Sequence, residues 1–225
     1  MRKLILDTET TGLDPGKDRI IEVACLEILS DTPTDIKYHS YFNPDGIIIS
    51  QEAQEIHGLN NSLLNQYKRF DDELDNFLKF IGDAQLIIHN AQFDISMINS
   101  ALERNDRPKI SMDRVLCTLE LAKKKFPGSK NNLNALCRRF NISLESREKH
   151  GALTDCYLLQ RVFIELNGGR QGNLDLSTID KVSEERFMNS SKDFKKIDIQ
   201  VSEDEIQNHL KMIQKIPNPI WKKLQ

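Results

Sequence analysis

Two acidic residues, Asp7 and Glu9, follow the short apolar run at residues 4–6 near the start of the chain. Such a run is typical of a buried strand, in which successive side chains point to opposite faces. Asp7 and Glu9 should therefore project from one side of the strand, with Thr8 turned to the other. Two like charges at that spacing repel, so the pair requires a bound cation or the protonation of one acid at neutral pH. The alternative explanation is a polar turn after an edge strand.

Two further acids, Asp94 and Asp155, lie on the apolar faces of helices predicted at residues 93–103 and 151–166. Positions three and four apart share one face of a helix. The apolar residues on these faces are Met97, Ile98, Ala101 and Leu102 in the first helix and Leu158, Leu159, Val162 and Leu166 in the second. Burying an unpaired charge is costly. A capping role at a helix start explains one such acid. Four inward acids on separate elements favour shared cations.

The type of ligand indicates which cations these are. Carboxylate oxygens without thiolates suit Mg²⁺ or Mn²⁺, and four acids suit two ions better than one. Two such ions roughly 4 Å apart stabilise the attacking and the leaving oxygen of a displacement at phosphorus. His150 lies in a predicted turn, five residues before Asp155. An imidazole with an ordinary pKa of about 6.5 fits a base that takes a proton from metal-bound water, although a purely structural histidine is the alternative.

Composition and charge limit the class of protein. The chain has 225 residues, 39% of them hydrophobic and 29% charged, which is ordinary for a globular protein. Asp7 interrupts the first apolar run after three residues, so we expect neither a signal peptide nor a membrane span, and a cytoplasmic location. The four scattered cysteines are expected to be reduced core residues. A net charge of −3 argues against strong binding to nucleic acid by this chain alone.

Apolar patterning predicts the elements that position the four acids. Residues 19–28 and 37–42 are rich in strand formers and should form an antiparallel meander with the first strand, closed by turns at residues 14–16 and 32–33. A short helix is expected at residues 52–57, ending at Gly58, and a longer amphipathic helix is expected at residues 71–81. Residues 86–88 should form another buried strand that runs into His89 and Asn90.

Asp7-x-Glu9, Asp94 within HNAQFD, and His150-x-x-x-x-Asp155 together resemble the three exonuclease motifs of the DEDD superfamily of 3′→5′ exonucleases, in its histidine branch. The Tyr-x-x-x-Asp motif of the tyrosine branch is absent. The segments DTETTGL, IHGL at residues 56–59 and FPGSKNNLNALCRRF at residues 126–140 are similar to the DnaQ-like epsilon subunits of bacterial DNA polymerase III. This resemblance covers residues 1 to about 169.

The resemblance implies a ribonuclease-H-like fold, with a mixed five-stranded sheet flanked by helices. It implies Asp7, Glu9, Asp94 and Asp155 as metal ligands and His150 as the base. Glu52 and His57 fall where the family contacts the terminal nucleotide, and Asp7, Glu9 and Asp155 are expected to contribute to that substrate site. Without the resemblance, Glu52 is equally well explained as a solvated helix acid and His57 as a residue at a helix C-terminus.

The composition changes after residue 168, so we expect an exonuclease domain at residues 1–168, a flexible linker at residues 169–200 and a helical tail at residues 201–225. Within the linker, Gln171, Leu174 and Leu176 resemble a short motif by which replication proteins bind the sliding clamp, a pattern that a polar linker also matches by chance. Ser202 and Glu205 form a capping box that opens the tail helix.

The tail helix should carry an apolar stripe that includes Leu210, and Trp221 follows it as an aromatic anchor. The tail is similar in position and pattern to the epsilon-subunit segment that docks on the alpha (polymerase) subunit. A helix folded back onto its own domain is the alternative.

These features together predict a proofreading exonuclease that removes mispaired 3′-terminal nucleotides from DNA and releases nucleoside 5′-monophosphates. We expect it to be monomeric within a hetero-oligomeric polymerase core. One alternative keeps the chemistry and trims RNA. The other is a non-catalytic adaptor between clamp and polymerase, which the intact set of inward acids disfavours.

Overall fold

The computed structural model describes residues 2–30, 32–145, 147, 149–168 and 201–217. The chain divides into two units, Met1–Asn173 and Leu174–Gln225, and each is described by itself.

The first unit is built on a mixed five-stranded sheet with the strand order β3-β2-β1-β4-β5. Its strands are β1 (Arg2–Thr10), β2 (Ile20–Leu29), β3 (Thr32–Tyr41), β4 (Gln85–Ile88) and β5 (Val115–Cys117). The first three form an antiparallel meander, whereas β4 and β5 run parallel to β1. The sheet confirms the predicted fold class and places β1 at its centre, so residues at the end of β1 can meet side chains from both flanking layers.

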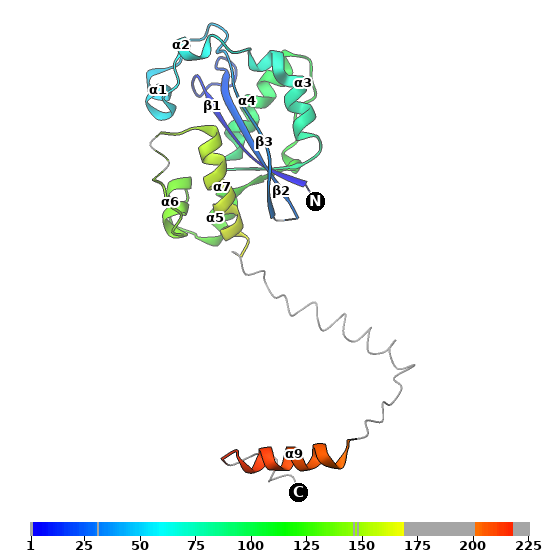
Figure 1. The fold of residues 1–225 in the computed structure, drawn as a ribbon. Helices are drawn as coiled ribbons and strands as arrows, with labels where there is room; N and C mark the ends of the chain where they lie inside the picture. The colour runs from blue at the N-terminus through cyan, green and yellow to red at the C-terminus, as the bar shows by residue number, and fades with distance from the viewer. Residues whose placement is uncertain (1, 31, 146, 148, 169–200, 218–225) are drawn as a thin grey trace. The chain divides into compact units, whose positions relative to one another are not determined.

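Helices cover both faces of the sheet (Figure 1). One layer contains α3 (Phe70–Ile81) and α4 (Ala91–Arg104), and the other contains α5 (Thr118–Lys125), α6 (Leu133–Arg139) and α7 (Ala152–Leu166). Alternation along β1 divides its side chains between the layers. Leu4 and Leu6 pack in the core with α3 and α4, and Ile5 packs in the core with α7. Asp7 and Glu9 therefore lie on the same face of β1 as Ile5, and Thr8 lies on the same face as Leu6.

Two short helices, α1 (Gln51–His57) and α2 (Asn61–Leu64), lie beside the sheet over a small cluster formed by Ile21, Ile49, Leu59 and Leu64. Ser50 caps the N-terminus of α1 by accepting a hydrogen bond from the backbone N–H of Ala53, and Gly58 ends the helix in the left-handed conformation with φ of 77°. The predicted helix end at Gly58 is therefore confirmed. A 3₁₀ turn, η1 (Met112–Arg114), leads into β5.

The predicted meander is confirmed, but one of its turns was placed wrongly. Thr32 and Pro33 lie inside β3, where they pair with Leu29 and Ile28, instead of forming the connection. A proline is tolerated there because β3 is an edge strand, in which only one side is paired with another strand. The strand is correspondingly longer than the predicted residues 37–42.

The second unit contains α9 (Glu203–Gln214), which begins with the predicted capping box of Ser202 and Glu205. Ile206 and Leu210 are about half exposed on this helix, and Ile213 is buried. The clamp-motif residues Gln171, Leu174 and Leu176, and also Trp221, lie outside the described residues. Among the helices that the structure describes, none has the length and apolar character needed to cross a lipid bilayer.

Candidate active site

The acids predicted on separate elements meet at the end of β1. Asp94 lies in the first turn of α4 and Asp155 in the first turn of α7, and both are buried. Asp7, Asp94, Asp155 and His150 line one cavity of about 450 Å³. Glu9 borders this group, because ligand atoms of Glu9, His150 and Asp155 all lie within 4.8 Å of one another.

Asp94 reaches the site from the layer opposite to α7, and Thr8 holds it there. The backbone N–H of Thr8 donates to Asp94 Oδ1 at 3.1 Å, and the Thr8 hydroxyl donates to the same oxygen at 2.7 Å. Thr8 does turn to the other face of β1, as the alternation predicts, and this orientation is what brings it to Asp94. The residue between the two acids therefore joins β1 to α4.

Burial raises the pKa values of three acids in the cluster, and repulsion between acids adds to this effect in two of them. Burial, followed by repulsion from Asp94, Glu9 and Asp155, raises the pKa of Asp7 well above its ordinary value. Burial and repulsion from Asp155 likewise raise the pKa of Glu9 to about 8. Burial raises the pKa of Asp94 to about 7, against the hydrogen bonds from Thr8 that lower it. Bound divalent cations would relieve this repulsion, so the donor set of hard oxygen ligands fits Mg²⁺ or Mn²⁺.

Glu22 adds a further buried carboxylate next to the cluster. It pairs with Glu9 across β1 and β2 and is 3% exposed. Its Oε1 lies 2.8 Å from His39 Nε2, which gives this acid a partner of its own. Glu22 contributes to the raised pKa values of Asp7 and Glu9.

Arg147 lies among these acids with its side chain only 6% exposed. Its Nε donates to Asp155 Oδ1 at 2.6 Å, and its Nη2 donates to Asp155 Oδ2. The guanidinium also donates to Asn134 Oδ1 through Nη1 and lies 3.1 Å from His150 Nδ1. A bidentate arginine of this kind holds a carboxylate in one orientation.

His150 is positioned by its backbone as well as by Arg147. Its N–H donates to the carbonyl oxygen of Ile56 in α1 at 3.0 Å, and its ring remains about half exposed. Burial and the adjacent Arg147 lower the pKa of His150, whereas Asp155 raises it, with a net decrease. The imidazole is therefore neutral at pH 7, the form in which it can accept a proton.

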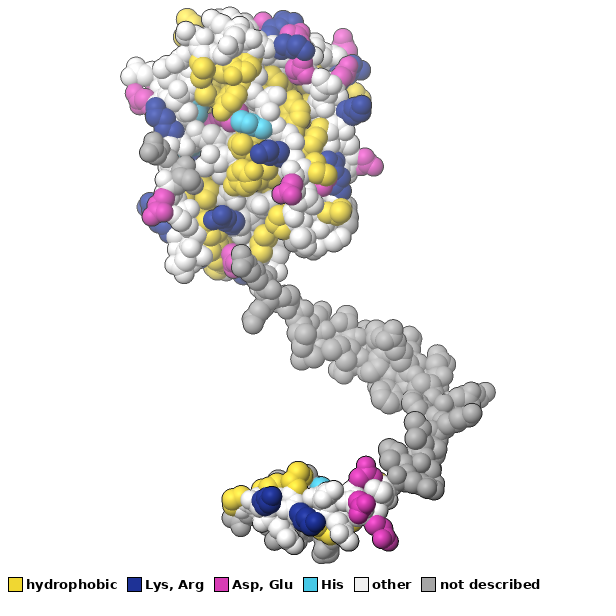
Figure 2. Space-filling model, in the orientation of Figure 1, with side chains coloured by type: hydrophobic (Ala, Val, Ile, Leu, Met, Phe, Trp, Pro, Cys, Tyr) yellow, Lys and Arg dark blue, Asp and Glu magenta, His cyan; other side chains and the backbone are white. Residues whose placement is uncertain are grey.

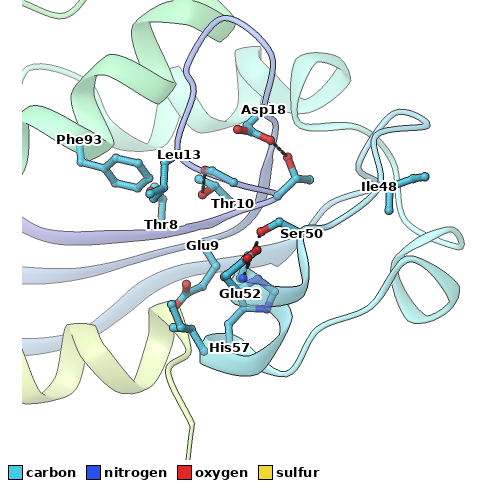
Figure 3. A pocket seen from close by; sticks show the side chains of 14 residues that line it. Thr8, Glu9, Thr10, Leu13, Asp18, Ile48, Ser50, Glu52, His57 and Phe93 are labelled. Carbon is cyan, nitrogen blue, oxygen red and sulfur yellow. Dashed lines mark hydrogen bonds between the residues drawn. The ribbon is translucent and has the colours of Figure 1, made fainter.

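A second cavity of about 450 Å³ adjoins the first, and both are lined by Thr8 and Phe93. Glu9 of β1 and Glu52 and His57 of α1 line this cavity (Figure 3). The structure thus brings Glu52 and His57 together beside Glu9, and their contact with a terminal nucleotide stays a prediction.

His57 is a buried, neutral side chain in this second cavity. Its Nδ1 accepts a hydrogen bond from the backbone N–H of Leu59 at 3.0 Å, and burial lowers its pKa. The cavity also has strongly exposed apolar side chains in its wall, Leu13 at 82% and Ile48 at 84%. Exposed apolar groups beside polar ones are typical of a site that binds a partly apolar ligand.

Sequence reasoning missed several residues of this site. Arg147 lies in a polar segment and Asn134 in the first turn of α6, and nothing in their type distinguishes them from solvated residues. The position of Arg147, three residues before His150, is the only local signal. Leu13 and Ile48 follow turn-forming residues and belong to no periodic pattern, so only the fold reveals that they line the cavity.

Comparison with known proteins finds two kinds of similarity in sequence. Residues 4–163 match the family model described as Exonuclease, RNase_T. The chain is 39% identical over 223 residues to the DNA polymerase III subunit epsilon of Rickettsia conorii, covering 96% of each chain. It is 34% identical over 238 residues to the protein of the same name from Buchnera aphidicola, covering 98% of this chain and 96% of that one.

Solved structures with a similar fold include exonuclease X in complex with 5′ overhanging duplex DNA, with a TM-score of 0.57 and 23% identity over 73% of this chain and 90% of that one. The nuclease domain of 3′hExo, a DEDDh family member bound to rAMP, has a TM-score of 0.63 and 16% identity over 74% of this chain and 92% of that one. At these identities the likeness shows the shared fold.

Proposed function

The chain belongs to the exonuclease family and, within it, to the epsilon subunits of DNA polymerase III, and from that premise we propose how it acts as a metal-dependent 3′→5′ exonuclease. It removes mispaired 3′-terminal nucleotides from DNA during replication and releases nucleoside 5′-monophosphates. The observation that carries this proposal is the convergence of buried carboxylates from β1, α4 and α7 beside His150. As part of a bacterial replicative polymerase, the protein works in the cytoplasm.

Asp7, Glu9, Asp94 and Asp155 are the residues that hold two divalent ions, Mg²⁺ or Mn²⁺. When bound there, the ions would supply positive charge that stabilises the attacking and leaving oxygens of the phosphodiester. Thr8 keeps Asp94 in place through its two hydrogen bonds. His150, neutral and half exposed at the mouth of the cavity, accepts the proton of the attacking water.

The second cavity receives the 3′-terminal nucleoside. Its apolar wall, formed by Leu13, Ile48 and Phe93, suits the face of a base, and the polar side chains of Glu52 and His57 suit the sugar. The cavity joins the acid cluster at Glu9 and Thr8, so a nucleoside bound there presents its phosphate to the metal ligands.

The proposed partners of this enzyme rest on the linker at residues 169–200 and on the helical tail that follows it. We propose that α9 and Trp221 bind the alpha subunit of the polymerase, with Leu210 as one apolar contact. We propose also that Gln171, Leu174 and Leu176 bind the sliding clamp. In this proposal the protein links clamp and polymerase, as the adaptor alternative does, and it is also a catalyst.

The test is hydrolysis of a 5′-labelled primer with a mispaired 3′ end by the full-length chain in Mg²⁺, with single-stranded RNA as the competing substrate. Asp7→Ala or Asp155→Ala should abolish release of the nucleotide. Asp75→Ala, which removes an acid that is 75% exposed on α3, should leave the rate unchanged. Full activity in EDTA, or wild-type turnover by Asp7→Ala, would defeat the metal-dependent mechanism. A strong preference for RNA would favour the RNA-trimming alternative.

A further inference from the structure

Arg147 engages both oxygens of a carboxylate that the proposed function assigns to metal binding. Nε bonds to Oδ1 and Nη2 to Oδ2 of Asp155, and the two side chains are only 6% and 7% exposed. A buried fork of this kind gives each oxygen of the carboxylate one charged hydrogen-bond donor. Asp155 therefore already has a positively charged partner before any metal ion arrives.

The charge of Arg147 also acts on Glu9 and Asp7. Repulsion from Asp155, Glu22 and Asp94 raises the pKa of Glu9, whereas attraction to Arg147 lowers it. A guanidinium remains protonated under all ordinary conditions, so its positive charge is always present. In the protein without metal ions, Arg147 thus supplies part of the neutralisation that buried acids require.

We infer that Arg147 is an internal counter-cation that a divalent ion must displace from at least one oxygen of Asp155. This inference rests on the proposed function, because it takes Asp155 as a metal ligand. An oxygen atom that accepts a short hydrogen bond from an arginine is not free to coordinate a metal ion in the same direction. Binding of the ion and bonding of Arg147 at Asp155 therefore compete.

Asn134 provides the guanidinium with a second anchor. Nη1 of Arg147 donates to Asn134 Oδ1, and this bond does not involve Asp155. When the bonds to Asp155 open, Asn134 keeps the arginine at the wall of the cavity, where its charge still opposes that of the ion. Competition for the oxygens and repulsion of like charges act in the same direction, and both weaken metal binding in the wild-type protein.

The experiment is titration of Mn²⁺ into metal-free, full-length protein, with the Kd measured by electron paramagnetic resonance of the free ion. Arg147→Gln should bind Mn²⁺ at least about tenfold more tightly than wild type, because both the competitor and the repelling charge are gone. Arg147→Lys keeps the charge but cannot form the two-oxygen fork, so its Kd should fall between the two. Arg138→Gln, the same charge change at an exposed position of α6, should stay within about twofold of wild type.

Unchanged or weaker Mn²⁺ binding by Arg147→Gln would overturn the inference and would make Arg147 a residue that only orients Asp155. If this variant does not fold, Asn134→Ala serves instead, since loss of the anchor should also tighten binding. Unchanged or weaker binding by Asn134→Ala then overturns the inference equally. Absence of Mn²⁺ binding by wild type would overturn the proposed metal site itself, whereas wild-type binding without tightening in the variants overturns only the role of Arg147.

Discussion

The buried acids hold their protons more tightly in the folded protein than in the unfolded chain. The pKa of Asp7 is raised by burial and by its acidic neighbours, and those of Glu9 and Asp94 rise to about 8 and about 7 from ordinary values of 4.5 and 3.8. At pH values between the ordinary pKa of these acids and their raised pKa in the folded protein, the folded state therefore binds more protons than the unfolded state. Their contribution to stability is fully present below about pH 4 and is lost as the pH rises through about 7 to 8.

We therefore expect the free energy of unfolding of the metal-free protein to fall between pH 5 and pH 8. Differential scanning calorimetry in EDTA measures this slope. Asp7→Asn should be more stable than wild type at pH 8 and should show a flatter slope, because one repelling charge is gone. Asp75→Asn, at an exposed position, should keep the wild-type slope. A wild-type stability that is constant or rises over this range contradicts the repulsion argument.

At the same scale, His150→Ala should lower turnover by roughly two to four orders of magnitude and leave the Kd for Mn²⁺ nearly unchanged. The pKa of His150 lies below its ordinary value of 6.5, so the wild-type rate should decline only on the acid side of that value. The variant should lose this acid limb. Rates measured from pH 5 to pH 8 on a short single strand test both points, with His209→Ala in α9 as the control. A rate for His150→Ala within a few-fold of wild type would show that bulk solvent, and not His150, accepts the proton.

At the scale of elements, α1 and the segment that carries His150 are joined at two points. The N–H of His150 donates to the carbonyl oxygen of Ile56, and Lys149 covers the glycine that ends α1. A Cβ on Gly58 would lie 2.7 Å from Lys149 Cδ, and its φ is 77°. The helix proposed to bind the nucleoside and the proposed base therefore share one support.

Gly58→Ala should consequently impair catalysis more than stability. Gly46 is the matched control, because its φ is 76° and a Cβ added there would have no other atom within 4 Å. Both alanines should cost about 1 kcal/mol of stability from the left-handed backbone. Only Gly58→Ala should also lower turnover, since the side chain of Lys149, the neighbour of His150, must move, and the added change Lys149→Ala should restore much of the rate. Equal turnover in the two single variants would show that the support is not needed.

At the scale of the whole molecule, the charge distribution does not suggest tight binding of DNA by the exonuclease unit alone. The net charge is −3, and on the face drawn in Figure 2 lysine and arginine side chains are interspersed with acids instead of forming one basic patch. Attachment to a polymerase would raise the effective concentration of the exonuclease at the primer end, which weak binding of DNA by this unit does not provide. In α9, the acids Glu203, Asp204 and Glu205 lie in the first turn, where their negative charges stabilise the helix by interacting with the positive end of its dipole.

Leu210→Ala combined with Trp221→Ala should weaken association with the alpha subunit by several kcal/mol, if these side chains fill a groove. Met212→Ala is the control on the same helix, because Met212 is also apolar and exposed but lies off the stripe of Ile206 and Leu210. Gln171→Ala with Leu174→Ala should weaken only clamp binding. Co-purification of the alpha subunit with each variant measures the first effect.

Removing residues 170–225 should abolish recovery of the alpha subunit while leaving hydrolysis of short single strands nearly unchanged. Equal recovery with full-length and shortened chains would show that the tail is not the tether. No recovery with either chain would favour the RNA-trimming alternative.

The sequence alone was sufficient for features that depend on local periodicity. The shared face of Asp7 and Glu9, the buried stripes that contain Asp94 and Asp155, and the helix end at Gly58 all follow from neighbours within a few residues. These features persist because side-chain direction in a strand or helix is set by the backbone repeat itself. The number of strands came instead from the family resemblance, since β5 has three residues and is too short for a periodic signal.

Only the tertiary structure decided which distant residues complete the site. Thr8 bonds to Asp94 across 86 positions of sequence, and Leu13 shares a cavity with Ile48 from another loop. Arg147 is eight positions from Asp155, yet it lies in a polar segment before the helix, so no repeat relates the two side chains. Such contacts depend on how separate elements pack, and a polar residue in a loop has the same local pattern whether it is solvated or buried against an acid.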